Sequence, residues 1–182
     1  MSGPAIGRLG HVGIHCRDLQ KQKAFYRDVL GLTVTDESDE RGLVFLSARP
    51  DEEHHELLLC AGRNVDGEAK LLQQVSFRCE NVEDVVGFYH RLKDRQVRFD
   101  RVITHGNAIG VYFFDPEGNR CEIYWPSGMP ARQPFGLDID LEQPIAEIKA
   151  AVAEAVRLYG KTGVSKATGS NTPGARAAAP AS

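Results

Sequence analysis

Four residues of this chain have side chains that bind divalent cations, and they lie in segments that otherwise favour β-strands. They are His11, Glu56, Gln74 and Glu122. The first two stand 45 residues apart and the last two 48 residues apart, so a similar spacing occurs in both halves of the chain. Neutral imidazole combined with carboxylate oxygen suits iron, manganese, nickel or zinc. The pattern predicts one divalent metal site with His11 and Glu122 as ligands, although a lone histidine can also simply lie on a strand.

Glu122 strengthens the metal interpretation. It follows Cys121 and precedes the segment 123–125, Ile-Tyr-Trp, so its carboxylate belongs to a strand otherwise fit for burial. Burying a carboxylate is unfavourable by several kcal/mol unless it is paired or bound to a metal ion. A shared metal is the simplest explanation of both residues.

The elements that position these residues come from an internal duplication. Residues 72–93 align with residues 9–30 at an offset of 63 without a gap. The identical pairs include Val12/Val75, Cys16/Cys79, Phe25/Phe88 and Tyr26/Tyr89. In each copy, alternating apolar and polar residues predict a strand, and Asp18 or Asn81 is a suitable N-cap for the amphipathic helix that follows.

Three short strands are expected after each helix, which makes each copy a β-α-β-β-β module. They cover residues 32–35, 43–47 and 56–60, and then 97–102, 109–114 and 120–125. The Asp-Pro-Glu-Gly sequence at 115–118 is a strong turn signal. Two modules, 7–62 and 70–127, predict an α+β domain over residues 7–127 with a concave cleft between its sheets.

The remainder of the chain has a different pattern. Residues 128–140 include a Pro/Gly-rich stretch and predict a loop, and residues 141–159 predict an amphipathic helix that covers either the domain or a second subunit of a homo-oligomer. Residues 160–182 are rich in Gly, Ser, Thr, Ala and Pro, which predicts a disordered tail.

The composition argues against several kinds of partner. The formal net charge is -3 and the basic residues form no block, so no nucleic acid partner is expected. No apolar run approaches the roughly 20 residues of a membrane span, and the N-terminus has no signal-peptide pattern. The four cysteines show no CxxC spacing and lie in apolar contexts, which predicts reduced core thiols in a cytoplasmic protein.

The segment from Tyr112 to Glu122, with its DPxGNxxE pattern, and the repeated strand-helix starts resemble the vicinal oxygen chelate superfamily. The resemblance covers residues 7–127. That superfamily holds type I extradiol dioxygenases, glyoxalase I, fosfomycin-resistance enzymes and bleomycin-binding proteins. The resemblance implies a small-molecule substrate and, in most of these groups, a divalent metal.

Three residues favour the extradiol dioxygenases within that superfamily. Tyr112 stands ten residues before Glu122, where those enzymes have a tyrosine that hydrogen-bonds a substrate hydroxyl. His105 resembles their second-sphere histidine, and His55 resembles the histidine that acts as acid and base towards substrate and oxygen. The resemblance implies cleavage of a catechol or another vicinally oxygenated aromatic compound by O2, with Fe(II) as the metal and Mn, Ni or Zn as alternatives.

Position 74 departs from the dioxygenase pattern. A second histidine ligand is expected there, but the chain has Gln74, a weaker and neutral donor. The set with Glu56 and Gln74 resembles glyoxalase I, in which zinc or nickel serves a lyase or isomerase and a glutamate, here Glu56 or Glu122, moves the proton. A non-catalytic drug-binding protein is the second alternative, against which His11 and Glu122 argue.

Overall fold

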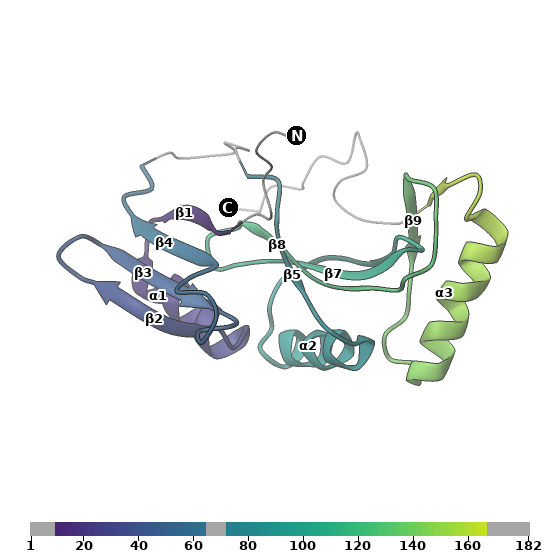
Figure 1. Cartoon of the computed structure of the whole chain (residues 1–182), viewed down its shortest axis with the longest axis horizontal. Helices are drawn as coiled ribbons and strands as arrows, with labels where there is room; N and C mark the ends of the chain where they lie inside the picture. Colours follow the sequence, from purple (N-terminus) through teal and green to yellow (C-terminus); the bar gives the residue numbers. More distant parts are fainter. Residues whose placement is uncertain (1–9, 65–71, 167–182) are drawn as a thin grey trace, which may run out of the picture. The chain divides into compact units, whose positions relative to one another are not determined.

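Each half of the duplication folds into its own sheet. The computed structural model describes residues 10–64 and 72–166 (Figure 1). The chain divides into two units, unit 1 (Met1–Lys70) and unit 2 (Leu71–Ser182).

Unit 1 has a four-stranded sheet in the order β1-β4-β3-β2. Strands β1 and β4 are parallel, and the other neighbours are antiparallel. The strands are β1 (Val12–Cys16), β2 (Thr33–Ser38), β3 (Leu43–Ser47) and β4 (Leu57–Ala61).

The helix of unit 1 begins at the predicted N-cap, because the Asp18 carboxylate accepts a hydrogen bond from the backbone N–H of Lys21 at 2.9 Å. Helix α1 (Leu19–Ala24) continues as a π-helical turn, η1 (Phe25–Val29), which differs from the ordinary helix expected. Phe25, Tyr26 and Val29 are all buried in this wider turn. Gly31, with φ of 79°, follows the turn in the left-handed conformation that commonly ends a helix.

Unit 2 repeats this arrangement and extends it. Its sheet has the order β10-β9-β6-β7-β8-β5, so β5 lies parallel to β8 as β1 lies parallel to β4. The strands are β5 (Val75–Arg78), β6 (Phe99–Thr104), β7 (Ala108–Phe114), β8 (Arg120–Pro126), β9 (Phe135–Asp138) and β10 (Val164–Ser165). The two β-α-β-β-β modules confirm the α+β architecture expected from the duplication.

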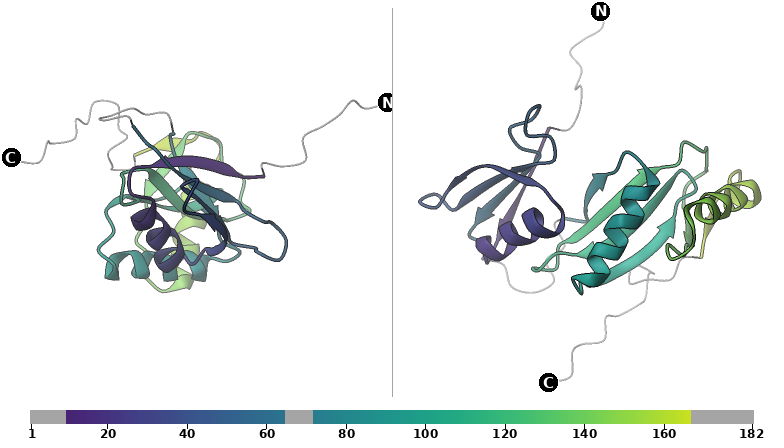
Figure 2. Two further views of the ribbon diagram at one scale, coloured as in Figure 1. Left: turned by 90° about the vertical axis from the view of Figure 1, so that its left-hand side faces the viewer. Right: turned by 90° about the horizontal axis from the view of Figure 1, so that it is seen from below.

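Helix α2 (Val82–Asp94) lies across one face of the sheet of unit 2 (Figure 2). The side chain of Asn81 caps it by accepting from the backbone N–H of Asp84 at 2.8 Å. Val85 and Leu92 of this helix are fully buried, as are Ile109 and Phe113 of β7. The sheet therefore has one face in the core of unit 2, which leaves its other face to carry polar groups.

The segment after β8 corrects two predictions. Residues 128–140 are not a loop throughout, because β9 pairs antiparallel with β6. The segment 160–182 is not disordered throughout, because β10 pairs with β9. Strand β9 satisfies backbone groups that β6 would otherwise leave unpaired at a sheet edge, and β10 does the same for β9. Residues 167–182 lie outside the described residues.

The expected helix over 141–159 is α3 (Ile145–Tyr159), which starts four residues later because Pro144 is its N-cap. Ile148 and Val152 bury its apolar side. No helix among the described residues has the length and apolar character that a membrane span requires.

Candidate functional site

A row of four polar residues crosses the sheet of unit 2. The register pairs Ser76 of β5 with Glu122 of β8, Glu122 with Tyr112 of β7, and Tyr112 with Arg101 of β6. Side chains paired directly across strands project from the same face. The structure therefore brings together the predicted residues Glu122 and Tyr112 and adds Ser76 and Arg101 to them.

Glu122 is a buried residue, with 6% of its surface exposed. Its Oε2 atom accepts hydrogen bonds from the Ser76 hydroxyl at 2.5 Å and from the Gln74 amide nitrogen at 3.0 Å. Among the described residues these donors are neutral, and no Lys, Arg or His side chain forms an ion pair with Glu122. A buried carboxylate that has hydrogen bonds but no counter-charge is a group that a cation stabilises.

Gly110 of β7 makes room for this carboxylate. A Cβ atom at Gly110 would lie 2.6 Å from Oε1 of Glu122 and 3.0 Å from Cε2 of Tyr112. The first distance is too short for a real contact and the second is unusually tight, so any larger residue at this position would displace the Glu122 side chain. The close approach explains the glycine within an otherwise bulky strand.

Gln74 has a fixed orientation at this site. Its Oε1 atom accepts a hydrogen bond from Nη1 of Arg120 at 2.8 Å. A guanidinium only donates, so the amide oxygen must face Arg120 and the amide nitrogen must face Glu122. An amide NH2 group does not bind a cation, so the observed position of Gln74 does not fit a metal ligand.

Arg120 connects this amide to a buried acid. Its Nε and Nη2 atoms each lie 2.8 Å from Oδ2 of Asp100, whose side chain is fully buried. The guanidinium also stacks on the ring of Tyr112, with its carbon 4.2 Å from the ring centroid. Arg120 thus holds Gln74 on one side and Tyr112 on the other.

His105 completes a hydrogen-bonded chain on unit 2. Its Nδ1 atom lies 2.7 Å from the carbonyl oxygen of Phe135, and its Nε2 atom lies 2.8 Å from the hydroxyl of Tyr112. The carbonyl only accepts, so Nδ1 carries a proton. Burial raises the pKa of Tyr112, and a hydrogen bond to Glu122 raises it further. The chain therefore runs from Phe135 through His105 and Tyr112 to Glu122.

The predicted histidines of unit 1 form a separate cluster. The rings of His11 and His55 lie 4.3 Å apart between centroids, and Nδ1 of His54 lies 3.0 Å from Nδ1 of His55. Phe45 packs edge-on against His55 at 5.1 Å. Burial lowers the pKa of His55, and positive charge on His11 or His54 would lower it further. These effects favour a neutral imidazole at position 55.

Glu56 has partners of its own in unit 1. Its Oε1 atom accepts from Nη2 of Arg49 at 2.8 Å, and its Oε2 atom accepts from the backbone N–H of Ala48 at 2.9 Å. Burial alone would raise the pKa of Glu56, but the hydrogen bonds from Arg49, Ala48 and Ser47 lower it overall. This carboxylate is engaged in an ion pair within its own unit.

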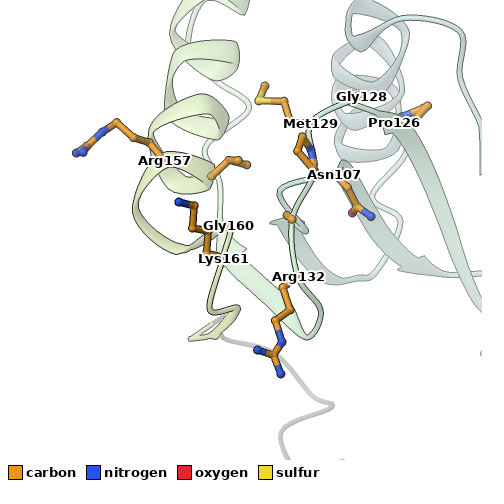
Figure 3. A pocket seen from close by; sticks show the side chains of 11 residues that line it. Asn107, Pro126, Gly128, Met129, Arg132, Arg157, Gly160 and Lys161 are labelled. Atoms are coloured by element: carbon orange, nitrogen blue, oxygen red, sulfur yellow. The ribbon is translucent and has the colours of Figure 1, made fainter.

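A hollow on the surface of unit 2 contains none of the predicted site residues. It lies beside the loop after β8 and the C-terminal end of α3 (Figure 3). Its lining includes Asn107, Met129, Arg132, Val156 and Lys161. The polar row on the sheet is therefore the better candidate for chemistry.

A family model describes residues 8–123, and its description is Glyoxalase/Bleomycin resistance protein/Dioxygenase superfamily. The chain belongs to this superfamily. The matched region spans both β-α-β-β-β modules, from just before β1 into β8.

Two curated relatives within the superfamily have dioxygenase names. The manganese-dependent 2,3-dihydroxybiphenyl 1,2-dioxygenase of Geobacillus genomosp. 3 is 30% identical over 129 residues, which are 69% of this chain and 38% of that protein. Biphenyl-2,3-diol 1,2-dioxygenase 3 of Rhodococcus globerulus is 28% identical over 121 residues, 64% of this chain and 62% of that protein. The chain thus spans less than two thirds of the length of these relatives.

Solved structures agree on the fold. A lactoylglutathione lyase from Agrobacterium tumefaciens superposes with a TM-score of 0.54 at 20% sequence identity, covering 67% of this chain and 96% of that one. At this identity the likeness shows the glyoxalase fold alone.

Members of this superfamily use divalent metals, and the donor groups of the chain fit one in part. Within either unit, the described residues bring no three His, Cys, Asp or Glu side chains together as ligands. The imidazole of His11 in unit 1 and the buried Glu122 in unit 2 are of the right chemical type. Gln74 is not, because Arg120 takes its oxygen.

The sequence did not single out Ser76, Arg120 or Asp100. Ser76 could have been found, because it stands two residues after Gln74 on the same predicted strand and so shares its face. Asp100 and Arg120 are twenty residues apart, and no spacing rule connects a long arginine side chain to one particular acid.

Proposed function

We propose that this chain is a metal-dependent oxygenase of the extradiol type, which opens the ring of a catechol or another vicinally oxygenated aromatic compound with O2. The observation that carries the proposal is the hydrogen-bonded chain from His105 through Tyr112 to Glu122 on one face of unit 2. The dioxygenase relatives support the same substrate class.

His11 and Glu122 are the proposed metal ligands. The bound metal would supply Lewis acidity, lowering the pKa of the substrate hydroxyls and gathering the substrate and oxygen. Ser76 and the Gln74 amide hold the Glu122 carboxylate in one orientation by hydrogen bonds to Oε2. Such supporting contacts fix the direction in which a carboxylate ligand presents its second oxygen.

Tyr112 and His105 handle a proton in this proposal. The Tyr112 hydroxyl positions a substrate hydroxyl, and Nε2 of His105 can accept the proton of Tyr112 as the substrate gives up its own. The Phe135 carbonyl holds Nδ1–H of His105 and stabilises the positive charge that results. His55, kept neutral by its lowered pKa, is the proposed base of unit 1.

An oxygen electrode tests the proposal. The full chain, loaded with Fe(II) or Mn(II), is expected to consume O2 in the presence of catechol or 2,3-dihydroxybiphenyl and to form a yellow ring-opened product. Glu122→Gln should abolish oxygen uptake and lower metal occupancy, whereas Glu80→Gln, an exposed carboxylate, should change neither. Loss of a hemithioacetal substrate with nickel or zinc and no oxygen uptake would replace the proposal with a glyoxalase-type reaction.

A further inference from the structure

Arg101 has a hydrogen-bond donor that nothing in the described part of the chain satisfies. Its side chain is 13% exposed, and its Nε atom donates to Oδ2 of Asp100 at 3.2 Å. The Nη2 atom is buried, and among the described residues it has no hydrogen-bond partner. Buried guanidinium groups are normally paired, so this donor points to an acceptor that is not part of the described chain.

The backbone of β6 aims Arg101 at the proposed site. The register shifts between Phe99 and Arg101, so that Phe99 pairs with Phe113 while Arg101 pairs with Tyr112. A bulge with one extra residue re-aims side chains, and such bulges are frequent beside active sites. Phe99 therefore lies in register with the fully buried Phe113, and Arg101 stands next to Tyr112 in the polar row.

The charges around Asp100 leave an excess of positive charge. Two guanidinium groups, Arg101 and Arg120, share this one carboxylate. Arg120 also donates a hydrogen bond to Gln74 and stacks on the ring of Tyr112, so its guanidinium is engaged within the described residues. The unused donor belongs to Arg101, which is paired across the strands with Tyr112, the residue proposed to meet the substrate.

We propose that Arg101 binds a carboxylate on the substrate, so that the site prefers a catechol acid to an uncharged catechol. The proposal rests on the proposed function, because it assumes that the aromatic ring lies against Tyr112. A guanidinium presents donors in a planar fork that matches a carboxylate, and the charge-assisted bonds formed in this way are strong. Arg101 therefore determines specificity and takes no part in moving protons.

Calorimetric titration of the full chain, without oxygen and with Mn(II) present, tests this preference. The probes are 2,3-dihydroxybenzoate and 3,4-dihydroxybenzoate, each compared with its own amide, which keeps the shape and the carbonyl oxygen but has no charge. At least one acid is expected to bind about 10-fold to 100-fold more tightly than its amide. Equal affinity for both members of each pair, or binding of neither, would overturn the proposal.

Variants locate the preference at one side chain. Arg101→Gln should remove the preference for the acid, so that the acid binds no more tightly than its amide, and Arg101→Lys should retain part of the preference, because lysine keeps the charge without the fork. Arg95→Gln, an exposed arginine after α2, should behave as the unaltered protein. A preference that persists in Arg101→Gln excludes Arg101. The titration measures binding and no ring opening. Failure of the oxygenase proposal would therefore show as a lack of oxygen uptake, whereas failure of the carboxylate proposal would show as equal affinities in the titration.

Discussion

The Tyr112 hydroxyl has one proton to donate and two possible acceptors, Nε2 of His105 and the carboxylate of Glu122. Nδ1 of His105 donates to the Phe135 carbonyl, so a neutral His105 has a lone pair at Nε2 and accepts a hydrogen bond from the Tyr112 hydroxyl. A protonated His105 donates through Nε2 instead, and the Tyr112 proton then turns to Glu122. The charge on the His105 imidazole therefore sets the direction in which the hydrogen bonds run between His105, Tyr112 and Glu122.

Tyr112→Phe should separate catalysis from metal binding. The variant removes the hydroxyl that connects His105 to Glu122 but leaves Ser76 and Gln74 on the carboxylate. We expect turnover to fall about 100-fold, the effect of losing a positioned proton-transfer group, with metal stoichiometry unchanged. Oxygen uptake and metal analysis measure the two quantities, and Tyr89→Phe, at a half-buried tyrosine of α2, is the control. An unaltered rate would remove Tyr112 from the mechanism.

Gln74→His should tighten metal binding. In the unaltered chain the Gln74 amide presents its NH2 group to Glu122, and this group cannot bind a cation. A neutral imidazole at position 74 has a lone pair that can. We expect affinity for Fe(II) or Mn(II) to rise about 10-fold, a size typical of changes next to metal sites, as measured by competition with a chelator. Unchanged affinity would indicate that position 74 does not reach the metal.

Only part of the candidate site could be predicted from residue types. Glu122 stood out as a carboxylate in an apolar strand, and Tyr112 and His105 through their resemblance to dioxygenase positions. The structure brings these three together. The orientation of Gln74 could not be predicted, because it depends on where the long Arg120 side chain lies, and that follows from the fully buried Asp100.

Among the elements, the β7–β8 hairpin sets the register that the polar row requires. Its turn is built on Asp115, which is 5% exposed. Oδ1 of Asp115 accepts from the backbone N–H groups of Glu117 and Asn119, and Oδ2 accepts from the side chain of Asn119 at 2.7 Å. The DPEGN motif is thus a structural feature that places Tyr112 opposite Glu122.

Asp115→Ala should destabilise unit 2 and weaken the site. Three hydrogen bonds to a buried carboxylate are lost, and the free energy of unfolding should fall by about 3 kcal/mol. Chemical denaturation monitored by circular dichroism measures the change. Asp115→Asn keeps one side-chain oxygen as an acceptor and should lose less stability. Equal stability of Asp115→Ala and the unaltered chain would show that the turn does not depend on this side chain.

The strands of both modules were predicted, but the bulge in β6 and strand β9 were not. Residues 109–114 and 120–125 correspond closely to β7 and β8. The bulge at Asp100 leaves no pattern in the sequence, since one extra residue in a short strand looks like ordinary variation. Strand β9 was missed because Pro130 and Pro134 beside it indicate a loop, while its pairing with β6 depends on tertiary structure.

At the scale of the whole molecule, the duplication predicted more than any single motif. Identical residues at an offset of 63 indicated two copies of one module, and both sheets have the first strand parallel to the last. The extension after β8 has no counterpart in the first copy, yet its Phe135 carbonyl holds His105. A pattern confined to the repeat could not predict this contribution.

The stability of the folded chain should fall as the pH rises above about 9. Burial, with Asp84 and Glu80 nearby, raises the pKa of the Cys79 thiol to about 11 from the ordinary value of 9.0. Between these values the folded chain keeps a proton that the unfolded chain releases, so rising pH favours unfolding. The raised pKa of Tyr112 acts in the same direction above about pH 10.

Cys79→Ala isolates the contribution of this thiol. Removing it should make the decline in the free energy of unfolding between pH 9 and 11 shallower, although small losses of packing lower stability at every pH. Urea denaturation at a series of pH values measures the slope, and Cys60→Ala, at a less buried thiol, should change it less. Because the prediction concerns the slope and not the absolute stability, a uniform loss at all pH values would count against it. Parallel curves for Cys79→Ala and the unaltered chain would mean that this thiol titrates alike in the folded and unfolded states.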